Sequence, residues 1–261
     1  MVHMETDTRS ALEVLRGRVV SCRRCPRLIQ YISTVVSVKA RRFASWTYWG
    51  RPLPGFGDPD AQLLIIGLAP AAHGGNRTGR LFTGDSSGDW LIRALCESGF
   101  ANQPHSVSRD DGLKLVSAYI TAVVRCAPPK NKPTKQEIAN CSEYLTEELN
   151  LLKQTKVILT LGRLAFDSYL RHIDLAGDCR PRFKHGKVFR LKKKPLLVVS
   201  YHPSRQNTQT GKLTWAMWLR VFKKIEQLLD ARAPSIEWHT VMLVSCEWLC
   251  LQSDLETSGD F

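Results

Sequence analysis

The chain has 261 residues, enough to bury a full core as one domain, and its apolar content of 43% is ordinary for a soluble globular protein. No apolar run approaches the length of about 18–20 residues that crosses a membrane, and residues 1–9 lack the basic-then-apolar pattern of a secretory signal. The formal charge of +13 favours a polyanionic partner, nucleic acid first, and we expect a cytoplasmic, nucleoid-associated protein without a membrane segment.

Apolar spacing and cap signals predict the helices, and short apolar runs predict the strands. Four strands are expected at 62–68, 118–124, 157–161 and 196–201. Five helices are expected at 9–21, 87–99, 134–153, 162–171 and 212–230. Ser86 and Thr134 are predicted to cap the second and third of these helices, with an acidic residue three positions on.

Strands that alternate with helices indicate a parallel sheet with helices on both sides. The predicted fold is therefore a three-layer α/β/α sandwich around a mainly parallel, four-stranded sheet, in a single domain over residues 1–261. The stretch 27–62 begins helically and then becomes irregular and aromatic. A basic run at 180–194 is expected to add a hairpin or edge strand, and the tail 235–261 has no pattern that assigns it a role.

A loop with five glycines, residues 67–85, joins the first strand to the next helix. In open α/β sheets, ligands bind where strands end and such loops begin. The spacing of Gly74 and Gly79 matches a phosphate-binding P-loop, but Arg80 and Leu81 stand where that loop needs lysine and a hydroxyl. A dinucleotide-binding GxGxxG pattern is also missing. The loop instead carries one aromatic residue, Phe82, and ends at one carboxylate, Asp85.

Four of the eight cysteines have a spacing that suggests a metal site: Cys22 and Cys25, then Cys126 and Cys141. In an intracellular chain, clustered cysteines indicate metal or iron–sulfur ligands before disulfides. Four thiolates can hold Zn²⁺ or a 4Fe–4S cluster, and spacing alone does not choose between them. The alternative is four free, buried thiols.

Four separated motifs together resemble a known family. They are CRRCP at 22–26, GLAPAAHGGNRTGRLFTGD at 67–85, RCAPPKNKPT at 125–134 and HPSRQNTQTGKLT at 202–214. In this order they resemble the uracil-DNA glycosylase superfamily, and within it the iron–sulfur family five, or type b. The resemblance covers residues 20–230. It implies an α/β/α fold, a 4Fe–4S cluster on the four cysteines named above, and excision of damaged bases from DNA.

The turn after the first strand distinguishes type b from the related iron–sulfur family four. Family four has an acidic residue soon after this turn, whereas here Gly67, Ala69, Ala71 and Ala72 make it apolar, as in type b. One position departs from several relatives, which carry asparagine where this chain has Ala122. By that pattern, the amide that reads the base moves to Asn131.

Cleaving the bond between base and deoxyribose develops positive charge on the sugar and negative charge on the base. His202, after the fourth strand, is expected to donate a hydrogen bond to the uracil O2 as that oxygen becomes anionic. Asp85 is expected to orient water and stabilise the sugar cation. The structural alternatives are a histidine that caps a turn before Pro203 and an aspartate that caps a helix.

The remaining candidate residues would hold the base and the DNA. Phe82 offers a face for stacking a flipped base, although a lone aromatic residue also suits a core, and Asn131 also suits a turn. Gly67, Ala69, Ala71, Ala72 and His73 are expected to wall the pocket. Arg205, Gln206 and Asn207 are expected to enter the minor groove.

We therefore predict a monofunctional DNA glycosylase that releases uracil and other deaminated bases, such as hypoxanthine and xanthine, from double-stranded or single-stranded DNA. It is expected to act as a monomer. The competing class is a non-catalytic iron–sulfur or zinc module that binds DNA or senses redox state. Such a module explains the charge and the cysteines, but not chemically active residues at several strand ends.

Overall fold

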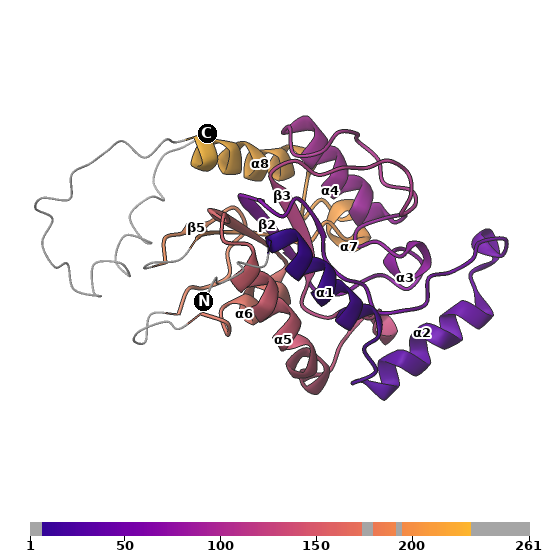
Figure 1. Cartoon of the computed structure of the whole chain (residues 1–261). Helices are drawn as coiled ribbons and strands as arrows, with labels where there is room; N and C mark the ends of the chain where they lie inside the picture. Colours follow the sequence, from indigo (N-terminus) through magenta and orange to yellow (C-terminus); the bar gives the residue numbers. More distant parts are fainter. Residues whose placement is uncertain (1–6, 174–179, 192–194, 231–261) are drawn as a thin grey trace, which may run out of the picture.

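A single sheet lies at the centre of the computed structural model, which describes residues 7–173, 180–191 and 195–230 (Figure 1). Its strands are β1 Phe56–Gly57, β2 Leu63–Gly67, β3 Ala118–Ala122, β4 Val157–Leu161, β5 Val188–Phe189 and β6 Leu196–Ser200. They lie in the order β1-β3-β2-β4-β6-β5. The four inner strands are parallel, and β1 and β5 pair antiparallel at the two edges. The tail 235–261 and the end of the basic run lie outside the described residues.

The sheet has six strands and not the predicted four, because β1 and β5 are added at its two edges. Each of these has only two residues, too few for an apolar period to be visible in the sequence. The expected edge strand in the basic run is confirmed, because β5 pairs antiparallel with β6. The four predicted strands are the parallel core, and every residue of β2, β3 and β4 is buried, as continuous apolar strands covered on both faces should be.

Eight α-helices are present in the described part of the chain. They are α1 Thr8–Val20, α2 Pro26–Val38, α3 Gly75–Thr78, α4 Ser86–Glu97, α5 Lys135–Leu151, α6 Arg163–Tyr169, α7 Arg205–Gln209 and α8 Trp215–Asp230. The sequence did not predict α3 and α7, which are single short turns inside predicted loops. Two 3₁₀ turns, Arg41–Phe43 and Pro129–Asn131, complete the secondary structure.

The helices form the two outer layers of the predicted α/β/α sandwich (Figure 1). On one face, α4 and α8 pack onto the sheet through buried side chains that include Leu91, Trp218 and Phe222. On the other face, α5 and α6 do so through Leu145 and Phe166. Helix α1 packs in turn on α5. The three-layer architecture predicted from the sequence is therefore confirmed.

One predicted helix cap is confirmed and the other was wrong. Thr134 and Glu137 form the expected capping box at the start of α5. At α4 the N-cap is Asp85 and not Ser86: Asp85 has an extended backbone, and its side chain accepts hydrogen bonds from the amides of Ser87 and Gly88. Ser86 is already the first helical residue. No helix among residues 7–173, 180–191 and 195–230 combines the length and apolar character needed to cross a membrane.

Candidate active site

The carboxyl ends of the four parallel strands meet at one edge of the sheet, where α/β proteins bind ligands. The glycine-rich loop 67–85 begins at this edge from β2, and His202 lies two residues beyond β6. Strand β4 alone separates β2 from β6. The sheet order therefore brings the loop and the histidine together, although they are far apart in the sequence.

Phe82 is held in an unusual backbone conformation that directs its ring toward the end of β2. Its φ of +50° lies in the left-handed region, which non-glycine residues seldom adopt. A Cβ added at Gly67 would lie 2.8 Å from two atoms of the Phe82 ring, so only glycine leaves room for it. The ring centroids of Phe82 and His202 are 6.0 Å apart. The structure thus brings these two predicted residues close together.

His202 is held from both sides and is neutral at physiological pH. Its carbonyl accepts a hydrogen bond of 2.8 Å from the Asn207 side chain, and a Cβ at Gly162 would lie 3.3 Å from its Cβ. Burial lowers the pKa of His202 to about 4. A neutral imidazole has one N–H group that can donate a hydrogen bond, and it carries no positive charge.

Titration of the His202 ring provides a direct check of this environment. We expect its NMR signals to shift with a midpoint near pH 4, because burial disfavours the charged form. The imidazole should then be neutral throughout the physiological pH range. A midpoint near the ordinary value of about 6.5 would contradict the buried, neutral assignment.

Asp85 combines the capping role with a free carboxylate oxygen. Both of its hydrogen bonds from backbone amides, each 3.0 Å long, go to Oδ1. Its Oδ2 accepts no hydrogen bond from the described residues and lies against Gly74, where an added Cβ would overlap it. Burial raises the pKa of Asp85, while the Gly88 and Ser87 amides and the Arg77 charge oppose the rise. The geometry leaves Oδ2 available to orient a water molecule.

Arg77 and Tyr48 stabilise this loop, and the sequence did not reveal either role. Arg77 is buried and donates from Nε to the His73 carbonyl at 2.8 Å and from Nη2 to the Gly84 carbonyl at 2.9 Å. The Tyr48 hydroxyl lies 3.0 Å from His73 Nδ1. Burial, followed by the charges of Arg42 and Arg77, lowers the pKa of His73. In the sequence, the one signal that could have pointed to Arg77 is its position among the glycines of the loop.

The other predicted pocket residues have mixed positions. Ala69, Ala71 and Ala72 are half-buried on the loop, and Ala69 and Ala72 pack against the hydrophobic core. Asn131 is exposed in a 3₁₀ turn with a φ of +55°. No hydrogen bond or ring contact within the described residues joins Asn131 to Phe82, Asp85 or His202. Its role in reading the base stays a prediction.

The segment predicted to enter DNA is the short helix α7. Arg205 and Gln206 are exposed there, as a groove-binding role requires. The charge of Arg205 acts on Asp89 in α4, which places α7 near the amino end of that helix. Asn207 instead uses its amide to hold the His202 carbonyl. The structure therefore assigns Asn207 a supporting contact, and its DNA contact stays a prediction.

The four predicted cysteine ligands come from separate segments: Cys22 follows α1, Cys25 caps α2, Cys126 follows β3 and Cys141 lies in α5. Burial raises the pKa of the Cys126 thiol, and Cys141, Cys22 and Cys25 raise it further, in that order. The other three thiols thus all act on the Cys126 thiol. None of the four is in a disulfide. Their soft sulfur donors suit an iron–sulfur cluster or zinc.

In the part of the chain that is described, no group of three or more His, Cys, Asp or Glu side chains lies close enough together to hold a single metal ion. Ion pairs fix the segment that carries Cys22 and Cys25 on α5. Arg18 pairs with Glu143 and Glu147, and Arg27 pairs with Glu137. These contacts attach the segment of Cys22 and Cys25 to the helix that contains Cys141.

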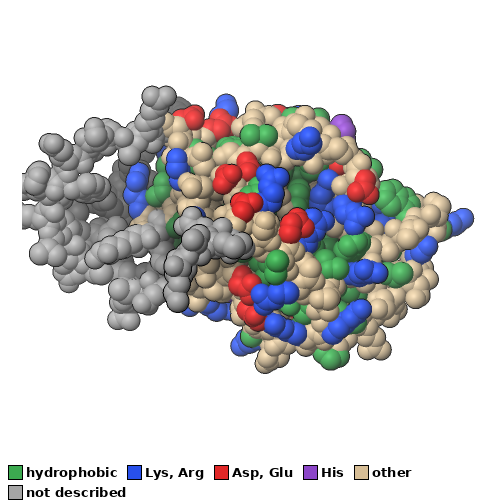
Figure 2. Space-filling view, in the orientation of Figure 1, with side chains coloured by type: hydrophobic (Ala, Val, Ile, Leu, Met, Phe, Trp, Pro, Cys, Tyr) green, Lys and Arg blue, Asp and Glu red, His purple; other side chains and the backbone are tan. Residues whose placement is uncertain are grey.

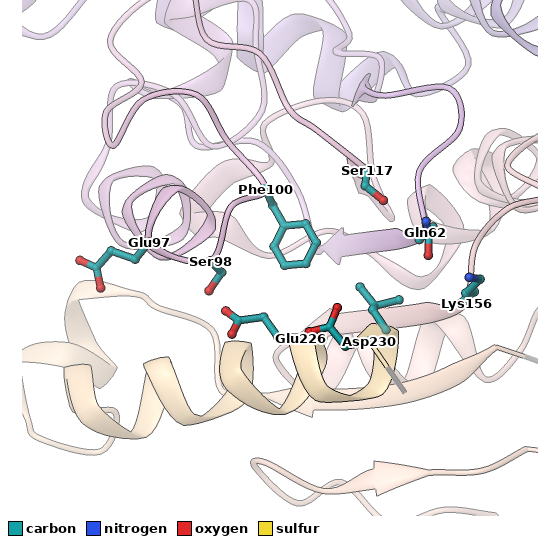
Figure 3. Close-up of a pocket in the computed structure, with 9 residues that line it drawn as sticks. Gln62, Glu97, Ser98, Phe100, Ser117, Lys156, Glu226 and Asp230 are labelled. Carbon is teal, nitrogen blue, oxygen red and sulfur yellow. The ribbon is translucent and has the colours of Figure 1, made fainter. Parts of the chain in front are cut away.

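An open cavity of about 630 Å³ lies at the opposite edge of the sheet (Figure 3). Gln62, Ser117 and Lys156, which immediately precede or adjoin the starts of β2, β3 and β4, line it together with the end of α8. The cavity also contains three carboxylates, those of Glu97, Glu226 and Asp230. An acidic hollow repels a polyanion, so we place the functional site at the carboxyl ends of the strands.

Sequence comparison shows which proteins this chain is similar to. A sequence model of the uracil DNA glycosylase superfamily matches residues 54–226. The chain is 49% identical over 210 residues to a type-5 uracil-DNA glycosylase of Thermus thermophilus, covering 80% of this chain and 94% of that protein. It is 50% identical over 198 residues to a type-5 uracil-DNA glycosylase of Pyrobaculum aerophilum, covering 76% and 84%.

A type-4 uracil-DNA glycosylase of Archaeoglobus fulgidus is more distant, at 30% identity over 193 residues, which cover 70% of this chain and 85% of that protein. The higher identity to the type-5 proteins agrees with the apolar turn after β2. The matched region includes the whole glycine-rich loop and His202. The chain therefore belongs to the uracil-DNA glycosylase superfamily.

Proposed function

We propose that this protein is a monofunctional DNA glycosylase that hydrolyses the N-glycosidic bond of uracil in DNA and so begins base excision repair. The observation that carries the proposal is that His202 and Phe82 lie close together at the carboxyl edge of the sheet. The neutral imidazole of His202 lies beside the Phe82 ring, and the loop that holds this ring ends at the free Oδ2 of Asp85. Membership of the superfamily supports it.

In the proposed reaction, the uracil leaves the duplex and stacks on Phe82, which costs a few kcal/mol and least at a mispair. The bond between C1′ and N1 breaks, and the electron pair leaves with the base. An N–H of His202 donates to the uracil O2 as it becomes anionic; one such donor typically contributes about 10²–10³ in rate. Asp85 orients the water that attacks C1′ and accepts its proton.

The pocket wall favours a range of bases wider than uracil. The support is the small size of Ala71 and Ala72 on the glycine-rich loop, because larger side chains at these positions would exclude purines. We therefore expect release of hypoxanthine and xanthine as well as uracil, from duplexes that each carry one lesion, detected by alkaline cleavage of the abasic sites. If uracil alone is released from this panel, the alanines do not widen the pocket.

The same panel tests the proposed activity against its alternative. A non-catalytic module would bind these duplexes and release no base from any of them. A glycosylase leaves alkali-labile sites wherever it acts. We propose duplex DNA as the main substrate, with single strands also accepted, and a monomer as the active form in the cytoplasm.

We also propose that Cys22, Cys25, Cys126 and Cys141 hold a 4Fe–4S cluster. Two observations support this assignment. Burial and then other cysteines raise the pKa of the Cys126 and Cys141 thiols, and the sequence resembles the iron–sulfur family. Hydrolysis moves no electron, so the cluster's contribution here is structural. A cluster on these cysteines would link α1, α2, the segment after β3 and α5. Cys126 also lies just before the loop that contains Asn131.

A further inference from the structure

The stretch between α2 and β1 combines positive charge with aromatic rings. We define the basic–aromatic segment as residues 39–51, which contain four basic residues, four aromatic residues and no acidic residue. Its basic residues are Lys39, Arg41, Arg42 and Arg51, and its aromatic residues are Phe43, Trp46, Tyr48 and Trp49. The proposed reaction does not use these charges.

The segment packs directly on the glycine-rich loop. The Trp49 amide donates to the Arg77 carbonyl at 3.0 Å, and the Gly50 amide donates to the Asn76 carbonyl at 3.1 Å. Tyr48 adds its contact with His73. Three contacts over three consecutive residues fix the segment beside the pocket, so it forms a wall of the active site.

Arginine side chains and aromatic rings hold one another in place at this wall. The Arg77 guanidinium carbon lies 3.9 Å from the Phe43 ring centroid and 4.1 Å from that of Trp46. The Arg42 guanidinium carbon lies 4.7 Å from the Phe43 ring centroid. Phe43 therefore orients two cations, one buried under the loop and one at the surface.

Within the described ranges, the basic residues of the segment form no ion pair with a carboxylate, while the Asp85 charge acts on Arg77. The Arg42 charge instead lowers the pKa of both His73 and Arg77. Arg41 and Arg42 are exposed. In Figure 2 basic side chains lie at the right-hand tip of the molecule, where Figure 1 places the chain after α2.

We propose that the basic–aromatic segment binds the phosphodiester backbone of the DNA strand that carries the flipped nucleotide, with Arg41 and Arg42 as phosphate ligands. The proposal rests on the function proposed above. Phosphates that flank the flipped nucleotide must pass close to the pocket, and this wall supplies unneutralised cations beside His73. Guanidinium groups bind phosphate through paired hydrogen bonds, and the Phe43 ring orients the guanidinium group of Arg42.

The test measures how DNA affinity depends on salt. Each phosphate contact contributes about 0.9 to the slope of log K against log salt on duplex DNA. We expect the Arg41→Gln/Arg42→Gln protein to lose about 1.8 of this slope on a duplex with one abasic analogue, between about 50 and 200 mM salt.

Two matched variants make the result decisive. Lys223→Gln/Lys224→Gln removes the same charge from exposed positions of α8, on another part of the surface, and should leave the slope nearly unchanged. Arg41→Lys/Arg42→Lys keeps the charge and should retain most of the slope. Equal slopes for the two glutamine variants would overturn the proposal. Fluorescence anisotropy reports binding without excision, so failure of the segment is distinct from failure of the proposed glycosylase activity.

Discussion

Replacing Asp85 with asparagine is expected to lower the single-turnover rate of uracil excision by about 10²-fold or more. The free Oδ2 lies in the loop that carries Phe82, and in the proposed reaction its negative charge orients water and stabilises the sugar cation. Asparagine has nearly the same shape but no charge. A rapid-mixing assay with protein in excess over a uracil-containing duplex measures this rate directly.

The same substitution should leave the stability of the fold nearly unchanged. Asp85 is the N-cap of α4, and its Oδ1 accepts from the amides of Ser87 and Gly88. Asparagine is also a good N-cap and retains an oxygen at that position. Asp85→Ala removes both the cap and the charge, so it should cost about 1 kcal/mol of stability in addition to the activity.

Ser86→Ala is the matched control, since Ser86 is the first helical residue and makes no capping hydrogen bond with its side chain. We expect a change in stability within about 0.5 kcal/mol and little change in rate. Excision by Asp85→Asn at close to the wild-type rate would defeat the assignment of Asp85. His73, on the same loop and held by Tyr48, would then be the next candidate.

The location of the α4 cap shows a limit of reasoning from the sequence alone. Aspartate and serine are equally good N-caps, and here they are adjacent. The backbone decides between them: Asp85 is extended, with φ −144° and ψ 163°, whereas Ser86 is helical. By contrast, Thr134 and Glu137 were predicted correctly because no competing cap lies next to them.

The inner strands could be predicted because burial on both faces makes their sequences continuously apolar. Leu63 to Ile66 and the other core runs are apolar because both faces of these strands are covered. Strands β1 and β5 depend on pairing with β3 and β6, which leaves no local period. Tertiary contacts also create the turns α3 and α7 within glycine-rich or polar stretches.

Predicting the site was possible for residues at strand ends and failed for residues that reach it across the fold. Phe82 and His202 both follow strands, and the order β2-β4-β6 brings them together. Arg77 holds the loop through the carbonyls of His73 and Gly84, and Tyr48 reaches it from a separate segment. Such contacts depend on the folded loop, and residue types alone do not reveal them.

Loss of a cysteine ligand is expected to have the largest effect on the protein as a whole. Binding of a metal group to its ligands is coupled to folding and contributes on the order of 10 kcal/mol in structural sites. Cys126→Ser and Cys141→Ser should therefore reduce the yield of soluble protein and the iron content before any effect on chemistry is measured. The wild-type protein should be yellow-brown, with broad absorbance near ~400 nm from cluster thiolates.

Cys96→Ser is the matched control, since Cys96 is half-buried in the last turn of α4 and lies apart from the other four cysteines in the sequence. It should retain full colour, iron content and Tm. Iron-loaded, normally stable Cys126→Ser protein would remove that residue from the ligand set. One equivalent of zinc without iron, after anaerobic purification, would replace the cluster with a structural zinc. In either case the junction of α1, α2 and α5 would still depend on Arg18 and Arg27, whose ion pairs with α5 need no metal.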